Sequence, residues 1–199
     1  MMTSQDHDRQ IADKADRIDG WIARDELEWL VRAASTRQVI IEVGSWKGKS
    51  TKALALSSPG RVIAIDHWKG SSNAQGGAHQ EAALLGSDGM FSVFSRNLKD
   101  EIAGGKVIPV REDSASAGPT VAGILRRFGG YADMIFIDGD HTYPAVQRDL
   151  EVYAPMVRPG GLFSGHDYQH GFPGVVQAVN ERFGRPYQVV GTIWWKRFS

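Results

Sequence analysis

The sequence predicts an α/β fold in which a doubly wound parallel sheet carries helices on both faces. Short apolar runs rich in β-branched residues alternate with segments of helical periodicity, and a glycine-containing turn follows the first run. Parallel strands that are buried on both faces lose the alternation of half-exposed strands, so continuous apolar runs are expected in this fold. With 199 residues, 42% of them apolar, residues 1–199 are expected to form one domain.

Five strands and four helices follow from this alternation. The strands are predicted at residues 39–43, 61–66, 106–110, 133–138 and 161–167, and the helices at residues 49–58, 119–128, 144–157 and 174–184. Prolines and glycines mark the helix boundaries, as at Pro59 and Gly60. Because strand and helix alternate, right-handed crossovers between parallel strands are expected. Residues 187–198 are expected to form a hairpin or a pair of final strands.

Two segments lie outside this alternation. Residues 1–36 are predicted as leading helices that cap one end of the sheet, with Leu27, Leu30 and Val31 on one face. Residues 67–89 are too long and too glycine-rich for an ordinary connection. They are a candidate lid over the substrate, and a disordered surface loop is the alternative.

Composition narrows the classes of partner. The 23 basic and 23 acidic side chains balance, so no net field would hold the protein on nucleic acid or an anionic membrane, and a small molecule is the expected partner. The absence of cysteine excludes disulfides and thiolate metal sites. No apolar run resembles a secretion signal or a membrane span, so a cytoplasmic location is expected.

The segment IIEVGSWKGKST, residues 40–51, indicates the kind of ligand. Only three residues separate Gly44 from Gly48, whereas a triphosphate-binding loop needs four, and the dinucleotide pattern Gly-x-Gly-x-x-Gly is also absent. Glu42 would repel a pyrophosphate and attract a cation. Asp66, at the end of the second strand, is placed to accept both ribose hydroxyls. The pattern therefore predicts an adenosine that carries a positively charged tail.

That ligand fits S-adenosylmethionine, and at this point the sequence resembles the class I S-adenosylmethionine-dependent methyltransferases, which have a Rossmann-like fold. The resemblance rests on IEVGSWKGKST and FIDGDHTYPAVQRDLEVYAPMVRPGGLFSGHDY, in that order, and runs from about Gly20 to the C-terminus. Within the class it is similar to the small-molecule and sugar O-methyltransferases. The resemblance implies a seven-stranded sheet with its last strand antiparallel, a sugar or natural-product hydroxyl as acceptor, and a homodimer.

The resemblance also implies a set of cofactor contacts. The methionine end would lie near Glu42 and Gly44, the ribose on Asp66, and the adenine against Asp113 and Ser114. The full set of predicted cofactor-binding residues is Glu42, Gly44, Ser45, Asp66, Asp113, Ser114 and Asp138. Taken singly, Glu42 and Asp66 would be surface carboxylates at strand ends, but beside the glycine loop a shared ligand is favoured.

Polar residues also end the fourth and fifth strands. Asp138 and the pair His166 and Asp167 would lie about 5 Å apart if these strands are neighbours. Two carboxylates suit Mg²⁺, which could lower the pKa of a bound hydroxyl, so Asp138, Asp167 and His166 are the predicted metal ligands. The alternative is that His166 and Asp167 form a hydrogen-bonded pair that orders the loop.

His141, three residues after Asp138, is the predicted general base, because an imidazole suits proton abstraction at neutral pH. The predicted catalytic residues are therefore His141 and Asp138, although His141 could instead cap the next helix. Lys47 and Lys49 are expected to be solvated at a helix start. Two rival functions remain open: a nicotinamide-dependent oxidoreductase on the same topology, and a non-catalytic protein that binds S-adenosylmethionine.

Overall fold

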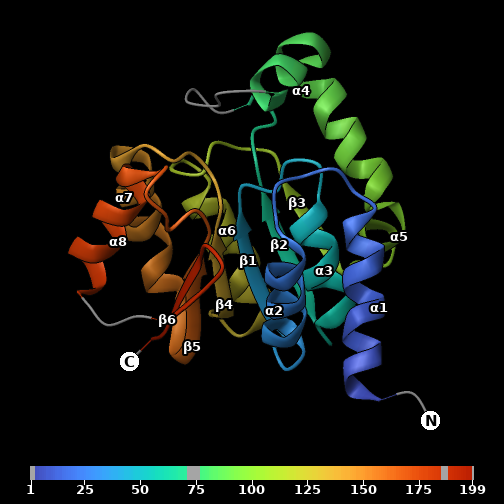
Figure 1. Ribbon diagram of the computed structural model, residues 1–199, viewed down its shortest axis with the longest axis horizontal. Helices are drawn as coiled ribbons and strands as arrows, with labels where there is room; N and C mark the ends of the chain where they lie inside the picture. Colours follow the sequence, from blue (N-terminus) through green and yellow to red (C-terminus); the bar gives the residue numbers. More distant parts are fainter. Residues whose placement is uncertain (1–2, 71–76, 185–187, 199) are drawn as a thin grey trace.

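The computed structural model describes residues 3–70, 77–184 and 188–198. Within these ranges seven strands form one sheet in the order β3-β2-β1-β4-β5-β7-β6 (Figure 1). Strands β1 to β5 are parallel, and β7 runs antiparallel to both β5 and β6. The strands are β1 (Val39–Val43), β2 (Arg61–Ile65), β3 (Val107–Val110), β4 (Ala132–Ile137), β5 (Val157–Gly165), β6 (Gln188–Val190) and β7 (Ile193–Arg197). The predicted doubly wound sheet with an antiparallel last strand is confirmed.

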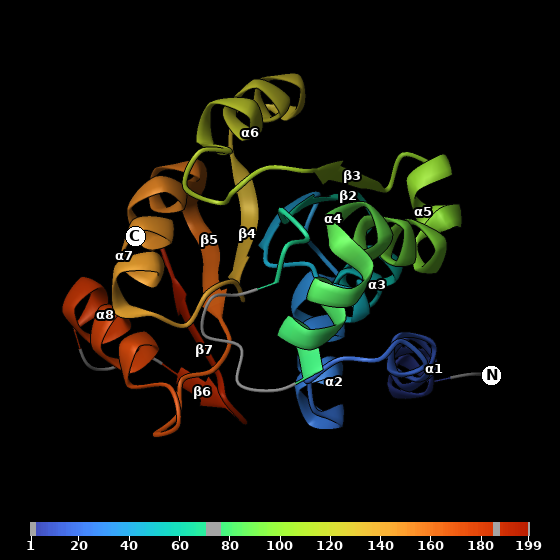
Figure 2. The same cartoon turned by 90° about the horizontal axis from the view of Figure 1, so that it is seen from above.

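Helices cover both faces of the sheet (Figure 2). The described helices are α1 (Ser4–Asp16), α2 (Arg24–Ala34), α3 (Lys49–Ser57), α4 (Gly77–Asn97), α5 (Lys99–Ala103), α6 (Gly118–Leu125), α7 (Tyr143–Tyr153) and α8 (Pro173–Phe183). Helices α1 to α5 share one apolar core with the sheet, and α6 to α8 share the other. None of these helices has both the length and the apolar composition needed to cross a bilayer.

The N-terminal helices form where they are predicted, but they cover a face of the sheet instead of capping its end. Leu27, Leu30 and Val31 of α2 are fully buried in the core that α1, α2 and α3 share. The ammonium of Lys49, in the first turn of α3, lies 2.8 Å from Asp16 at the end of α1. This face of the sheet therefore depends on the leading segment.

The glycine-rich segment at residues 67–89 was predicted as a loop, which is wrong from Gly77 onward. Helix α4 begins at Gly77 and continues through a break at Gly86, where φ is 67°. Residues 71–76 lie outside the described part of the chain. In Figure 1, α4 extends above the end of the sheet where β1, β2 and β4 terminate. The lid itself stays a prediction.

Candidate active site

The turn after β1 passes closely under the turn after β4. Gly44 adopts a φ of 87°, and a Cβ added to it would overlap the backbone carbonyl of Asp138. Gly48, with a φ of 91°, leaves no room for a Cβ against Leu98. The two glycines of the predicted loop are thus required by a left-handed backbone and a close approach.

Glu42 lies beneath this turn and is fully buried. One of its carboxyl oxygens accepts hydrogen bonds from Thr51 Oγ1 and from Ser45 Oγ, the latter at 2.8 Å. The other, Oε1, has no hydrogen-bond partner among the described residues. Burial raises the pKa of Glu42 to about 7, although the hydroxyls of Ser50, Thr51 and Ser45 act in the opposite direction.

Asp66 joins the loops that follow β1 and β2. Its carboxylate accepts the backbone N–H of Trp46 at 2.8 Å and that of Trp68 at 2.6 Å. The side chain of Asp66 is 13% exposed, so it lies at the floor of the loops. The structure therefore brings Asp66 next to the glycine turn, as the sequence predicts.

Asp113 and Ser114 follow β3 at the same end of the sheet. Asp113 lines an open cleft of about 510 Å³ together with His67, Lys69 and Arg111, and further lining residues are Ser87 and Glu112. The backbone carbonyl of Ser114 accepts a hydrogen bond from the Tyr153 hydroxyl at 2.7 Å. A cleft of this volume is in the range of small-ligand sites.

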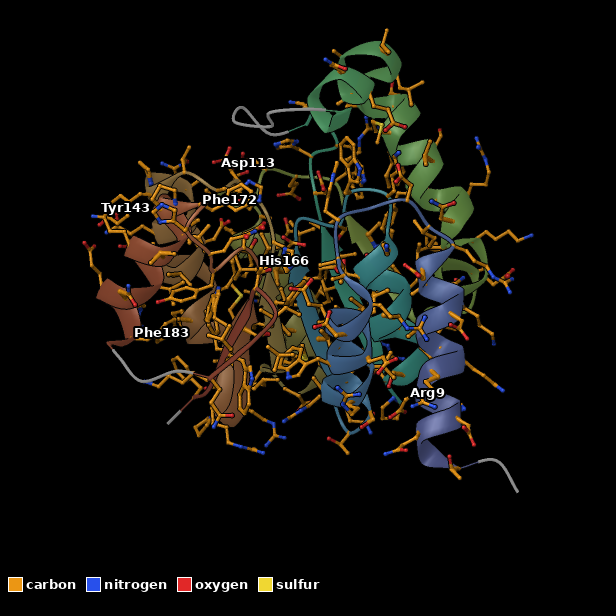
Figure 3. The ribbon with its side chains drawn as sticks, viewed as in Figure 1. Arg9, Asp113, Tyr143, His166, Phe172 and Phe183 are labelled. Atoms are coloured by element: carbon orange, nitrogen blue, oxygen red, sulfur yellow. The ribbon has the colours of Figure 1, made fainter. Side chains whose placement is uncertain are left out.

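Four side chains from the ends of β4 and β5 form one cluster. His141 Nε2 lies 2.8 Å from Asp167 Oδ2. His166 Nδ1 lies 3.3 Å from the same oxygen of Asp167 and 3.4 Å from Asp138 Oδ1. Figure 3 shows His166, Asp113 and Phe172 toward the same end of the sheet. All the predicted catalytic and metal-binding residues therefore come together.

Comparison with known proteins assigns this architecture. The sequence profile of a family described as "Methyltransferase domain" matches residues 41–168, more than half of the chain. The chain belongs to this methyltransferase family.

Several other proteins resemble the methyltransferase. The uncharacterized protein y4gI of Sinorhizobium fredii is 27% identical over an alignment of 185 residues, and the match covers 84% of this chain and 18% of that protein. The chain thus spans less than a fifth of the relative's length. The structure of CalS11, a calicheamicin methyltransferase, has a TM-score of 0.65 at 14% identity and covers 98% of this chain and 93% of its own.

Two further solved structures share the fold of the methyltransferase. The O-methyltransferase NovP has a TM-score of 0.61 at 14% identity, with 96% of this chain and 88% of that one covered. Cofactor-bound Rv0187 from MTB has a TM-score of 0.63 at 17% identity, with 95% and 86% covered. At such identities the likeness establishes the shared sheet and helices.

In the cluster of Asp138, His141, His166 and Asp167, burial, hydrogen bonds and neighbouring charges shift the pKa values in different directions. Burial disfavours the charged form of His166, but the surrounding carboxylates outweigh it and raise its pKa to about 12. Burial also opposes ionisation of Asp167, yet hydrogen bonds from His141 and His166 hold its pKa well below the usual range. Asp167 in turn raises the pKa of His141 against the effect of burial. Burial raises the pKa of Asp138.

Glu26, which sequence reasoning did not select, belongs to the same cluster. Its carboxylate lies 3.1 Å from His166 Nε2 and accepts the backbone N–H groups of Ala23 at 2.9 Å and Thr192 at 2.6 Å. Glu26 is 3% exposed. The available signal was its place at the third position of α2, where a glutamate commonly accepts the N-cap backbone N–H, here that of Ala23, and otherwise attracts no functional interest.

Lys47 is not the solvated residue that the sequence predicts. It is buried, and its ammonium lies 2.7 Å from Asp19 and 2.6 Å from Glu81. Lys49 is half-buried as well and pairs with Asp16. Both lysines therefore fasten the glycine turn to the α1–α2 connection of the methyltransferase.

The carboxylate cluster does not fit a magnesium ion. Ligand atoms of Asp138, His141 and Asp167 lie within 4.8 Å of one another, but one of the three is an imidazole nitrogen, and Mg²⁺ selects oxygen. The ring of His166 already contacts both carboxylates from one side. The predicted pairing of His166 with Asp167, which was the alternative to a metal site, is present.

Proposed function

We propose that this methyltransferase transfers the methyl group of S-adenosylmethionine to a hydroxyl oxygen of a small acceptor, such as a sugar or a small natural product. The observation that carries the proposal is the pair of His141 and Asp167 at 2.8 Å, beside Asp138 and next to the glycine turn. A hydroxyl acceptor needs a base at the point where the donor methyl group arrives, and this pair supplies one. CalS11, described in its apo structure as a TDP-rhamnose 3'-O-methyltransferase, and the O-methyltransferase NovP share the fold and support an oxygen acceptor.

In the proposed complex the cofactor lies across the carboxyl ends of β1, β2 and β3. Its methionine end would lie at Gly44 and Ser45, and its ribose would lie beside Asp66. The adenine would enter the cleft that Asp113 lines, against Ser114. The fold supports this placement, because ligands of doubly wound sheets bind where the strand order reverses, here around β1.

The proposed reaction is a direct displacement. The acceptor oxygen forms a bond to the methyl carbon as the carbon–sulfur bond of the sulfonium breaks, and the hydroxyl proton passes to His141. Because Nε2 of His141 is bound to Asp167, Nδ1 is left as the accepting atom. The ring of Phe172, centred 4.5 Å from that of His141, limits the movement of the base. The chain otherwise aligns donor and acceptor and excludes water.

Titration calorimetry tests the cofactor. The full chain should bind S-adenosylmethionine and S-adenosylhomocysteine and should not bind NAD or ATP. Binding of NAD in their place would overturn the proposal in favour of an oxidoreductase. Binding of the two sulfur ligands without turnover of any hydroxyl acceptor would favour a non-catalytic binding protein.

The Asp138→Asn variant tests the reaction. It should abolish turnover, because the Asp138 side chain is proposed to face the acceptor. It should leave S-adenosylhomocysteine affinity within about threefold of the wild type, because the carbonyl that packs on Gly44 belongs to the backbone, which the substitution keeps. Near-normal turnover would remove Asp138 from the mechanism. A small-molecule acceptor, the absence of nucleic-acid or membrane partners, and a homodimer stay predictions.

A further inference from the structure

The imidazole of His166 lies among three carboxylates that come from three separate parts of the chain. Nε2 faces Glu26 of α2 at 3.1 Å, and Nδ1 faces Asp138 after β4 at 3.4 Å and Asp167 after β5 at 3.3 Å. His166 is 7% exposed and Glu26 is 3% exposed. Water therefore provides little of the screening that these charges need.

This geometry determines which form of the ring fits. A neutral imidazole carries one N–H donor and one lone pair, so one nitrogen would aim its lone pair at a carboxylate. Only the imidazolium donates from both nitrogens, and here both nitrogens face carboxylate oxygens.

Glu26 fixes the ring in this orientation. Its two oxygens accept hydrogen bonds from the backbone of Ala23 at 2.9 Å, and from the backbone and hydroxyl of Thr192 at 2.6 and 2.9 Å. The carboxylate is therefore held by the start of α2 and by the turn between β6 and β7 before it meets His166. A ring held at Nε2 cannot turn its Nδ1 away from Asp138 and Asp167.

A divalent ion held between Asp138 Oδ1 and Asp167 Oδ2 would lie beside His166 Nδ1, which is 3.4 Å from the first oxygen and 3.3 Å from the second. Magnesium sits about 2.0–2.1 Å from each ligand oxygen and needs an octahedron around it. An ion between these two carboxylates would face the positive edge of the His166 ring at short range. The charges that would attract the ion are already compensated from within the chain.

We propose that His166, positioned by Glu26, takes the place of a divalent metal ion between Asp138 and Asp167, so that the site holds no such ion. If the proposed methyl transfer holds, it follows that the transfer runs without metal and that Asp167 remains free to orient His141. The groups that face the ring are Glu26, Asp138 and Asp167, and His141 reaches it only through Asp167. Glu26 is a positioning residue in this scheme.

Manganese titration followed by electron paramagnetic resonance tests the proposal directly. The metal-free wild-type chain should show no saturable Mn²⁺ site. The double variant Glu26→Gln, His166→Asp removes the imidazolium and its buried partner charge and adds a carboxylate at the same point. It should gain one saturable Mn²⁺ site, which a third change, Asp138→Asn, should remove.

The protonation of the His166 ring gives a second measurement, which is made on the wild type and uses a folded His166→Asn variant only to assign the signal. Long-range nitrogen–proton correlation spectra of the wild type should show two protonated ring nitrogens for the histidine whose signal disappears in His166→Asn. A wild type that binds stoichiometric Mn²⁺ or Mg²⁺ at Asp138, or a His166 ring with one unprotonated nitrogen, would overturn the proposal. So would a folded double variant that gains no metal site.

These outcomes are separable from those of the proposed function. Metal content and ring protonation are measured without cofactor or acceptor, and S-adenosylhomocysteine binding is measured by calorimetry on the same sample. A metal-bound wild type that still binds S-adenosylhomocysteine overturns only the proposal that His166 takes the place of the ion. A metal-free wild type that fails to bind it overturns only the function.

Discussion

Glu42 provides a quantitative test of the glycine turn, because it is the acidic group buried directly beneath it. The Glu42→Gln variant keeps the size of the side chain and leaves an oxygen to accept the hydroxyls of Ser45 and Thr51. It removes the titration. Since Glu42 is wholly buried and its pKa is raised to about 7, this titration should appear in the stability of the fold.

The expected sign follows from proton uptake. Between its ordinary pKa of 4.5 and about 7, Glu42 binds a proton in the folded state that it has lost in the unfolded state. The stabilisation that this proton provides is present in full below the unfolded pKa of 4.5. It is lost as the pH rises through the folded pKa of about 7, where the buried group must ionise. At about 1.4 kcal/mol per pKa unit, the whole shift is worth roughly 3 kcal/mol, and most of it falls between pH 5 and pH 8.

Urea unfolding of the wild type and of Glu42→Gln at pH 5 and pH 8 measures this difference. The free energy of unfolding of the variant relative to the wild type should rise by about 2–3 kcal/mol from the lower to the higher pH. Asp149, whose pKa burial also raises to about 7, is present in both proteins and cancels. Glu151→Gln, at an exposed position on α7, controls for the change in net charge. Parallel pH profiles for wild type and Glu42→Gln would refute the reasoning.

Three further predictions concern the loops and the base. Gly44→Ala should lower cofactor affinity at least tenfold in calorimetry and reduce the free energy of unfolding by about 1–3 kcal/mol. The backbone of Gly44 is left-handed, and the added Cβ would overlap the Asp138 carbonyl. Unchanged affinity would contradict the close approach. Asp167→Asn keeps a residue type that tolerates the φ of 60° at this position but removes the anion that raises the pKa of His141. The acid limb of the pH–rate profile should therefore move to lower pH. An unchanged acid limb would assign it to another group. Lys47→Met should lower the free energy of unfolding by about 1 kcal/mol in low salt and by less in high salt, since both acidic partners of the lysine are partly exposed; a loss that salt does not change would indicate packing instead of charge.

The central strands could be predicted because each is an unbroken apolar run. The predicted run at residues 39–43 is β1, and the one at residues 133–138 is offset by one residue from β4. Strand β5 begins at Val157, four residues earlier than predicted, although Pro159 and Gly160 within it are residues typical of a helix end. The backbone N–H of Gly160 instead donates to the carbonyl of Phe198, a residue far along the sequence. A local sequence pattern around Gly160 does not contain that partner.

Helix α4 shows a signal that glycines concealed. Met90 and Phe94 of α4 and Leu98, the residue directly after it, lie four residues apart and are all fully buried, which is the spacing of one helix face. The break at Gly86 and the glycines before it make the segment resemble a loop when only composition is considered. Here tertiary burial of an apolar face outweighed a low intrinsic helix propensity.

The cluster was predictable only in part, for a related reason. Asp138, His141 and Asp167 end strands or follow them closely, so the topology brings them together once the strand order is known. The contact between Glu26 and His166 spans 140 residues, and Lys47 meets Asp19 across 28. These pairings depend on how α2 and the α1–α2 connection pack on the sheet, which neither periodicity nor motif spacing specifies.

The packing of the two turns indicates how the proposed donor and acceptor sites are kept aligned. The backbone N–H of Asp138 donates to the carbonyl of Val43 at 2.7 Å, and the carbonyl of Asp138 lies against Gly44. The turn proposed to hold the methionine end and the residue proposed to face the acceptor are therefore parts of one rigid contact. A displacement of either turn moves both sites together, so their relative position depends on this backbone contact. Since displacement at carbon requires oxygen, methyl and sulfur in line, a fixed spacing between the turns after β1 and β4 is the feature that the reaction needs most.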